Sequence, residues 1–288
     1  MPELPEVETM CRGLRPSIGL TVAAIRQPPC RCKPIQITPS MATIRRRLVG
    51  KELVDVRRLG KRILLDFGED LLILQPKMTG MVSLDTAPDS AYVRLSIQLN
   101  NGPPHSIVFW DRRGLATVIM LAKNQLTPVL IDGRLGPDAL EIAEAQFVER
   151  LRRTRRPIKV ALMDQALVAG IGNLYASEIL HVAKIHPAVS ANRLTGRQCQ
   201  RLFQSMRTIL HEAIRYEGST LADGTYRNAL NNPGSYQNHH RVYQREGKRC
   251  RQCHRGTIRR IVQSGRSTFF CPACQRPPRK KPARVSVS

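Results

Sequence analysis

The first residues of the chain combine an amine nucleophile with two carboxylates. Pro2 follows the initiator Met1, and Glu3 and Glu6 come directly after it. Once the initiator is removed, which a small second residue permits, Pro2 has a free secondary amine with a pKa of about 8, so part of it is nucleophilic at neutral pH. Such an amine can form an iminium with an aldehydic sugar carbon, while Glu3 and Glu6 can donate and accept protons. Pro and acidic residues are also typical of a helix N-terminus, so both interpretations stay open.

Four cysteines near the C-terminus have the spacing of a metal site. Cys250 and Cys253 form one Cys-x2-Cys pair, and Cys271 and Cys274 form another. Four thiolates predict one tetrahedral, structural zinc ion per chain, because no position is left for water. The residues between the pairs alternate like a β-hairpin too small to fold without the metal. The alternative is two disulfides or free thiols, and it is less expected for a protein inside the cell. The remaining cysteines are predicted to be reduced thiols without a chemical role: Cys11, Cys30, Cys32 and Cys199.

The charge of the chain predicts an acidic polymer as its partner. The 288 residues include 46 Lys and Arg against 22 Asp and Glu, which gives a net charge of +24 and a pI near 10.7. An anionic membrane is the competing partner, but the sequence has no long apolar run, signal-peptide core or basic amphipathic anchor. Runs of charge are usually only solvated faces, but the metal-fixed hairpin rich in arginine, together with the net charge, favours contacts with DNA phosphates.

The sequence predicts two kinds of structure that position the N-terminal residues and the cysteines, a β-rich part followed by a helical part. A helix is predicted over Glu6 to Leu14, and turn residues then separate short stretches with the length and period of strands. Residues up to about 125 therefore predict an antiparallel sandwich or barrel against which this single helix packs. The predicted strands are Leu53 to Val56, Ile63 to Phe67, Leu71 to Leu74, Val93 to Leu99 and Ile107 to Trp110.

From about Asp138 the periodicity becomes helical, which predicts a second domain made of helices. A polar, Gly-rich stretch from Glu217 to Gly234 follows and predicts a long functional loop. The basic segment from Arg276 to Ser288 has nothing to bury and predicts a disordered tail that attracts DNA. The predicted helices are Glu141 to Arg153, Ile158 to Leu167, Leu174 to Ala183 and Gly196 to Tyr216.

Three motifs, in order along the chain, resemble those of formamidopyrimidine-DNA glycosylases. They are the opening run 2–8 (Pro-Glu-Leu-Pro-Glu-Val-Glu), the run 164–178 containing Gly170-Ile171-Gly172-Asn173, and the zinc hairpin with 265–271. The resemblance implies an α+β protein: an N-terminal β-sandwich with an N-terminal helix, a helix-two-turns-helix domain and a C-terminal zinc-finger β-hairpin. The implied bounds are 1–130 for the catalytic sandwich domain, 131–245 for the helix-two-turns-helix domain, 246–276 for the zinc finger and 277–288 for the tail.

The resemblance also implies roles for residues that match the family motifs. Pro2 is the implied nucleophile, Glu3 the general acid, and Glu6 the residue that helps to hold the catalytic segment in place. Lys61 matches a hairpin lysine near the lesion phosphates, and Arg266 matches a zinc-finger arginine that clasps a phosphate, a role that suits a bidentate guanidinium. Asn173 begins a helix, where free amides and the helix dipole attract a phosphate.

An enzyme that acts on a base must extrude it from the duplex and fill the gap left behind. Met78 and Arg113 match two of the three gap-filling residues of the family, although Met78 taken alone also suits a core position. Leu115 stands where an aromatic residue is usual, and it stacks less well on bases. Gln75 stands in place of the usual His, and Arg112 stands in place of the usual Pro. These departures leave open which lesion is preferred and which opposite base is recognised, and they do not affect the chemistry expected of Pro2.

The combined prediction is a base-excision repair enzyme that removes oxidised purines from damaged double-stranded DNA and nicks the strand by β,δ-elimination. It is expected to act as a monomer in the bacterial cytosol at the nucleoid, with no membrane partner. One alternative is an endonuclease VIII-like glycosylase for oxidised pyrimidines, with the same nucleophile. Another is a DNA-binding paralogue without catalytic activity, which an intact Pro2 and Glu3 disfavour.

Overall fold

The computed structural model describes residues 2–220, 226, 228 and 232–277. These divide into two compact units, each discontinuous in sequence. The first unit takes in 1–142, 165–172 and 207–239, and the second takes in 143–164, 173–206 and 240–288. The predicted tail lies outside the described residues from 278 onward, as do positions 221–225, 227 and 229–231 of the predicted loop.

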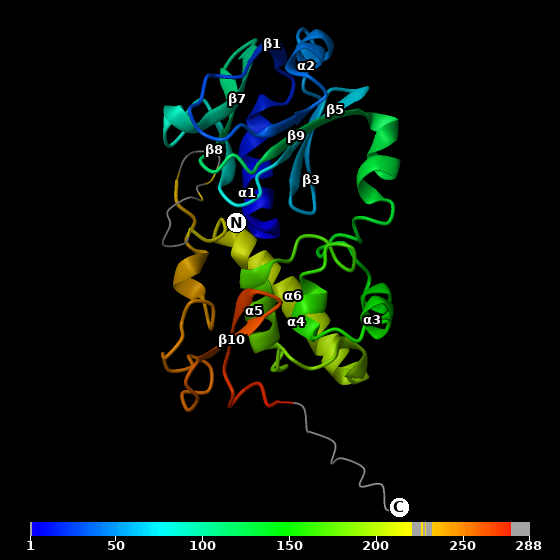
Figure 1. The fold of residues 1–288 in the computed structure, drawn as a ribbon, viewed down its shortest axis with the longest axis vertical. Helices are drawn as coiled ribbons and strands as arrows, with labels where there is room; N and C mark the ends of the chain where they lie inside the picture. The colour runs from blue at the N-terminus through cyan, green and yellow to red at the C-terminus, as the bar shows by residue number, and fades with distance from the viewer. Residues whose placement is uncertain (1, 221–225, 227, 229–231, 278–288) are drawn as a thin grey trace, which may run out of the picture. The chain divides into compact units, whose positions relative to one another are not determined.

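The first unit is built on two β-sheets, as the sequence predicted (Figure 1). The four-stranded sheet has the order β1 (Thr21–Arg26), β7 (Val93–Asn100), β8 (Ser106–Asp111), β6 (Gly80–Leu84). The five-stranded sheet has the order β2 (Gln36–Thr38), β9 (Thr117–Ala122), β5 (Asp70–Gln75), β4 (Arg62–Asp66), β3 (Asp55–Leu59). The expectation of an antiparallel arrangement was wrong for one pair, because β2 runs parallel to β9.

The core of this unit lies where apolar side chains of both sheets meet α1 (Leu4–Leu14). On α1 the residues Val7, Met10 and Leu14 are fully buried in that core, and their spacing puts them on one face of the helix. The helix begins with a capping box, in which Glu3 and Glu6 satisfy each other's backbone N–H groups,. The predicted N-terminal helix is therefore confirmed and starts two residues earlier.

A second helix in this unit, α2 (Met41–Leu48), was not predicted. Its first turn is capped by Ser40, whose hydroxyl accepts a hydrogen bond from the Thr43 N–H at 3.3 Å. Only Ile44 and Leu48 of this helix are buried. These two residues, at positions i and i+4, are too few to give a helical pattern of apolar residues that can be recognised in the sequence.

The second unit is mainly helical and contains the hairpin that carries the cysteines. Its helices are α3 (Glu144–Arg152), α4 (Ile158–Leu162), α5 (Asn173–Val182) and the first half of α6 (Gly196–Arg215), and its hairpin pairs β10 (Arg259–Gln263) with β11 (Arg266–Phe270). The helix predicted over 158–167 ends at Leu162, because the chain then turns and the Gln165 side chain bonds to the backbone of Gly170 and Ile171.

Short helical turns connect the main elements. They are η1 (Arg15–Ser17), η2 (Ser90–Tyr92), η3 (Lys123–Gln125), η4 (Thr127–Ile131), η5 (Ala191–Arg193) and η6 (Tyr236–His239). Within the described residues, no helix has both the length and the apolar character needed to cross a membrane.

Candidate active site and zinc centre

The N-terminal residues of the first unit lie against the Gly170–Gly172 turn. Pro2 and Glu3 are both buried, and Glu3 is only 4% exposed. The Gly172 N–H donates a hydrogen bond of 2.7 Å to Oε2 of Glu3, and the Leu4 N–H donates one of 3.0 Å to the Gly170 carbonyl. The turn therefore fixes both the side chain of Glu3 and the backbone that presents Pro2.

Position 172 must be glycine because the backbone of the turn leaves no space for a side chain next to Glu3. A Cβ atom at Gly172 would lie 2.3 Å from Cδ of Glu3, far inside van der Waals contact. Gly170 has a φ of +105° and faces Leu4 in the same way, so this position needs glycine for its backbone conformation as well. The two glycines of the motif thus allow the N-terminal segment to pack closely against the turn.

Gly172→Ala is expected to displace the Glu3 carboxylate and to lower the rate of base excision by at least about tenfold, the effect of about 1.4 kcal/mol on the barrier. Single-turnover excision on a duplex with an oxidised purine measures this rate. Gly196→Ala is the matched control, since a Cβ atom there meets nothing within 4 Å. Equal rates for the two variants would show that the position of Glu3 does not limit excision.

Glu6 connects the catalytic segment to the loop that follows α6. One carboxylate oxygen accepts the Glu3 N–H at 2.9 Å and the other accepts the Ser219 N–H at 2.9 Å. The loop is held further by Tyr226, whose hydroxyl donates to the Glu217 carbonyl at 2.9 Å. Both oxygens of Glu6 accept backbone N–H groups, which suits a carboxylate that positions other groups in its ionised form.

Lys61 reaches the same turn from the β3–β4 hairpin. Its Nζ donates to the Ile171 carbonyl at 2.8 Å. The hairpin is anchored by Arg58, which bonds to the carboxylates of Glu8 and Asp138 and is 6% exposed at its side chain. Burial lowers the pKa of Arg58, but its hydrogen bonds and attraction to Asp138 and Glu8 outweigh burial and leave that pKa raised. Glu3 and Lys61 thus bond to the same turn, Pro2 precedes Glu3 in the chain, and Glu6 bonds to the backbone of Glu3.

The three predicted gap-filling residues surround one buried carboxylate. Asp111 is fully buried and accepts hydrogen bonds from the Thr79 hydroxyl and from the backbone N–H groups of Arg113 at 3.2 Å and Leu115 at 2.7 Å. Thr79 is next to Met78, which is 40% exposed. Asp111 therefore holds the Met78 segment and the Arg113 to Leu115 loop beside each other, with Met78 and Arg113 exposed.

In the second unit, a buried lysine joins the other two predicted DNA-binding residues. Lys159 is fully buried, and its Nζ donates to Oδ1 of Asn173 at 2.5 Å, to Oγ1 of Thr268 at 2.7 Å and to the Ser267 carbonyl at 3.1 Å. These acceptors match the three protons of an ammonium group. Lys159 thereby fixes the start of α5 relative to β11, whose first residue is Arg266.

Arg266 borders a basic pocket of about 270 Å³ in the second unit. Arg266 is exposed, and its guanidinium has no hydrogen bond or ion pair with any other described residue, so it is available to a ligand. Arg156, on the same pocket, is paired with Asp164 at 2.5 Å. The pocket is lined by Arg156, Lys159, Val160, Met163, Asp164, Gln263, Ser264 and Arg266.

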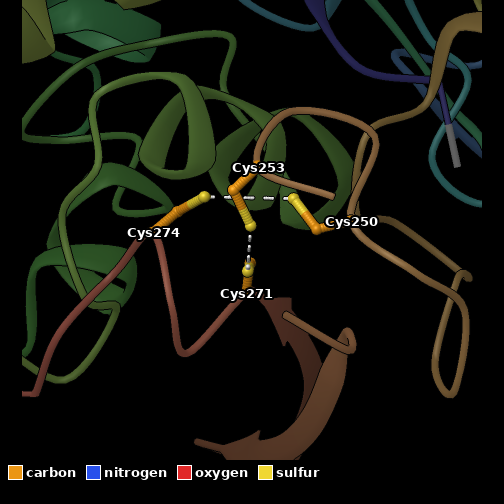
Figure 2. A group of neighbouring side chains, drawn as sticks. All are labelled: Cys250, Cys253, Cys271 and Cys274. Atoms are coloured by element: carbon orange, nitrogen blue, oxygen red, sulfur yellow. Dashed lines mark hydrogen bonds between the residues drawn. The ribbon is translucent and has the colours of Figure 1, made fainter. Parts of the chain in front are cut away.

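The four cysteines point toward a common centre (Figure 2). All four Sγ atoms lie within 4.8 Å of one another, with 3.9 Å between Cys250 and Cys274 and 3.7 Å between Cys253 and Cys271. Zinc–sulfur bonds of about 2.3 Å in a tetrahedron place sulfurs about 3.8 Å apart. The donor set fits a structural zinc ion, and four thiolates complete its coordination.

Comparison with known proteins identifies the family. The model of the formamidopyrimidine-DNA glycosylase N-terminal domain matches residues 1–118, that of the H2TH domain of the same glycosylases matches 135–224, and that of the zinc finger found in FPG and IleRS matches 247–277. The formamidopyrimidine-DNA glycosylase of Chloroflexus aurantiacus is 37% identical over 281 residues, covering 96% of this chain and 98% of that protein. The chain belongs to the formamidopyrimidine-DNA glycosylase family.

Solved structures of this family share the fold. A complex between the Lactococcus lactis Fpg and DNA containing an abasic site has a TM-score of 0.83 at 30% identity, covering 96% of this chain and all of that one. The MutM (FPG) protein of Thermus thermophilus has a TM-score of 0.83 at 34% identity, covering 95% of this chain and 98% of that one. The α+β fold with a zinc finger, implied by the three sequence motifs, is confirmed. The predicted domain bounds stay a prediction.

Two positioning residues were missed from the sequence. Lys159 was included only as part of a predicted helix, although a lone lysine among the apolar residues of Ile158–Leu162 is a signal for a buried, bonded charge. Asp111 was noted only as a neighbour of Arg113. Nothing local in the sequence shows that its carboxylate bonds to Thr79, because that contact joins separate loops.

Proposed function

We propose that this protein excises oxidised purines from damaged double-stranded DNA and then cleaves the strand at the resulting abasic site. The protein is a DNA-repair glycosylase by family. The observation that carries the proposal is the docking of Pro2 and Glu3 on the Gly170–Gly172 turn, with Lys61 bonded to the same turn. A further Lactococcus lactis FPG structure contains DNA with Fapy-dG, an altered purine.

Pro2 is the nucleophile in this proposal. Its amine attacks the sugar carbon that bears the base. The base leaves with the electrons of the broken bond and takes up the proton that the attacking amine loses. Glu3 supplies a proton as general acid at the sugar ring oxygen, so that the ring opens and an iminium forms with Pro2. Loss of a C2′ proton to solvent sends its electron pair toward the iminium and expels the 3′ phosphate. Loss of a C4′ proton then expels the 5′ phosphate in the same way. Hydrolysis finally frees Pro2, and Glu6 holds Glu3 in place throughout.

The remaining predicted residues bind and deform the duplex. Met78, Arg113 and Leu115 enter the gap left by the extruded base, at the cost of unstacking it. Asn173, at the start of α5, and Arg266 bind backbone phosphates, and Lys61 lies near the phosphates of the lesion. The loop between Glu217 and Tyr236 covers the extruded base in this proposal. Glu6 anchors its first part through the Ser219 N–H, and residues 221–225, 227 and 229–231 lie outside the described residues.

All of the proposed groups come from one chain, which supports the proposal that the protein acts as a monomer. DNA as the substrate and the net charge of +24 support a location in the bacterial cytosol at the nucleoid. No membrane partner is proposed.

Borohydride trapping on matched duplexes tests the function. The protein is incubated with duplexes that contain an oxidised purine, an oxidised pyrimidine or no lesion, with and without borohydride, and covalent adducts are resolved by mass. The expected result is a strong adduct at Pro2 with the purine lesion. A dominant adduct with the pyrimidine lesion would instead support the endonuclease VIII-like alternative, and binding without any adduct would support a paralogue without catalytic activity.

Arg266→Ala is expected to weaken duplex binding and to reduce the magnitude of the slope of log K against log salt by about 0.9. The variant makes one phosphate contact fewer, so fewer counterions are released when it binds. Binding titrations at several salt concentrations measure the slope. Arg46→Ala, an exposed arginine on α2, is the control and should leave the slope almost unchanged. Identical slopes for both variants would remove Arg266 from the phosphate contacts.

A further inference from the structure

The last turn of α5 brings a histidine to the zinc centre. His181 is fully buried, and its Nε2 lies 3.4 Å from Sγ of Cys250. This distance is within hydrogen-bond range for sulfur. Among the described residues, the cluster that could hold the metal consists of the four cysteines, and His181 does not belong to it. His181 is therefore next to a ligand and outside the ligand set.

The other ring nitrogen determines which way this hydrogen bond runs. Nδ1 of His181 is buried and has no hydrogen-bond partner among the described residues. A proton on Nδ1 would be a buried donor without an acceptor, which costs about 1 to 3 kcal/mol. The neutral ring therefore has its proton on Nε2, directed at the sulfur. A zinc-bound cysteine is a thiolate and accepts that hydrogen bond.

We propose that His181 donates a hydrogen bond to the zinc-bound thiolate of Cys250 and so stabilises the zinc centre from α5. Four thiolates around Zn²⁺ leave an excess of negative charge, and an N–H directed at one sulfur offsets part of it. The bond also fixes the Cys250 side chain to a helix instead of to the hairpin alone.

A second residue on the same face of α5 bonds to the backbone segment that precedes Cys250. Glu178, three residues before His181, accepts backbone N–H groups from Arg241 at 2.9 Å, Val242 at 2.9 Å and Tyr243 at 2.8 Å. Residues three apart lie on one side of a helix, so α5 holds both the segment that leads to Cys250 and the sulfur itself. Since α5 begins at Asn173, the helix that presents the proposed phosphate ligand is bonded to the zinc centre at its other end.

Zinc release from the full-length protein tests this proposal without any measurement of catalysis. The purified zinc-loaded protein is mixed with the chelator 4-(2-pyridylazo)resorcinol, and the absorbance of the zinc complex reports the rate of release. His181→Phe keeps a planar ring and removes the donor, and it is expected to weaken zinc retention by about 10- to 100-fold. His181→Gln places an amide N–H near the position of Nε2 and is expected to restore most of the retention.

His186→Phe is the matched control. His186 packs edge-on against Phe270 with ring centroids 4.8 Å apart, so this variant tests general loosening of the packing around the hairpin. Retention in His186→Phe should stay close to that of the unmodified protein. Equal release from His181→Phe and the unmodified protein would overturn the proposal, as would equal loss in His181→Phe and His186→Phe.

A pair of polar variants keeps the test decisive if His181→Phe does not fold. His181→Asn is too short to place its amide at Nε2, whereas His181→Gln is long enough. Circular dichroism confirms that both variants are folded. Faster zinc release from the Asn variant than from the Gln variant supports the hydrogen bond, and equal rates contradict it.

Discussion

Pro2→Gly is expected to reduce strand cleavage to background while duplex affinity stays nearly intact. A secondary amine forms an iminium that is always positively charged, whereas the imine formed by a primary amine must first be protonated. The positive charge attracts the electrons that move during elimination. Glycine presents a primary amine on a more flexible backbone, so both the electronic and the positional advantages of Pro2 are lost. Gel analysis of a duplex with an abasic site measures cleavage, and binding to an uncleavable analogue measures affinity.

Pro16→Gly is the control for this substitution, because Pro16 is exposed in η1 and takes no part in the turn that holds Glu3. It should cleave at the rate of the unmodified protein. Mass spectrometry of the N-terminus accompanies both measurements, since a retained initiator Met would block the amine. Normal nicking by Pro2→Gly, or full activity in a protein shown to retain Met1, would mean that another group is the nucleophile.

Glu3→Gln is expected to lower base excision by about 100- to 10,000-fold, the range over which a general acid contributes. The amide oxygen of Gln can still accept the Gly172 N–H that now bonds to Glu3 at 2.7 Å, so the fold of the turn is preserved while the transferable proton is lost. Cleavage of a preformed abasic site should fall much less, because an abasic sugar also opens to its aldehyde in water without help from Glu3. Single-turnover assays on both substrates measure the difference.

Glu52→Gln removes an exposed carboxylate and serves as the control for the change in charge. Its excision rate should match that of the unmodified protein. Equal losses on the two substrates in Glu3→Gln would contradict a role specific to base removal and would point to general damage to the site.

Most of the longer elements could be predicted from the sequence, whereas β1, β2, β6, β9 and α2 were missed. Strands such as β7 alternate between buried and partly exposed residues along most of their length, and α5 and α6 have long helical patterns. In β1 a bulge between Val22 and Ala24 breaks the alternation, and β6 is buried at every position, so neither shows a period of two. The three residues of β2 are too few for any pattern.

The candidate site was predictable to the extent that its residues lie in contiguous motifs. The paired cysteines and the N-terminal run fall in that class. The hydrogen bonds between Glu6 and Ser219 and between Lys61 and Ile171 join residues more than one hundred positions apart, and only folding reveals them. Asp111 and His181 were missed for the same reason, since each bonds to a partner on another element.

The anchoring of the gap-filling loop by Asp111 has a consequence for how the sequence can vary. Asp111 bonds to main-chain N–H groups of Arg113, Leu115 and Ala116, and main-chain groups are the same whichever side chain a residue bears. The loop can thus have Leu115 in place of an aromatic residue and still keep its backbone conformation. The residue predicted to meet the opposite base can therefore change while the support from Asp111 stays the same.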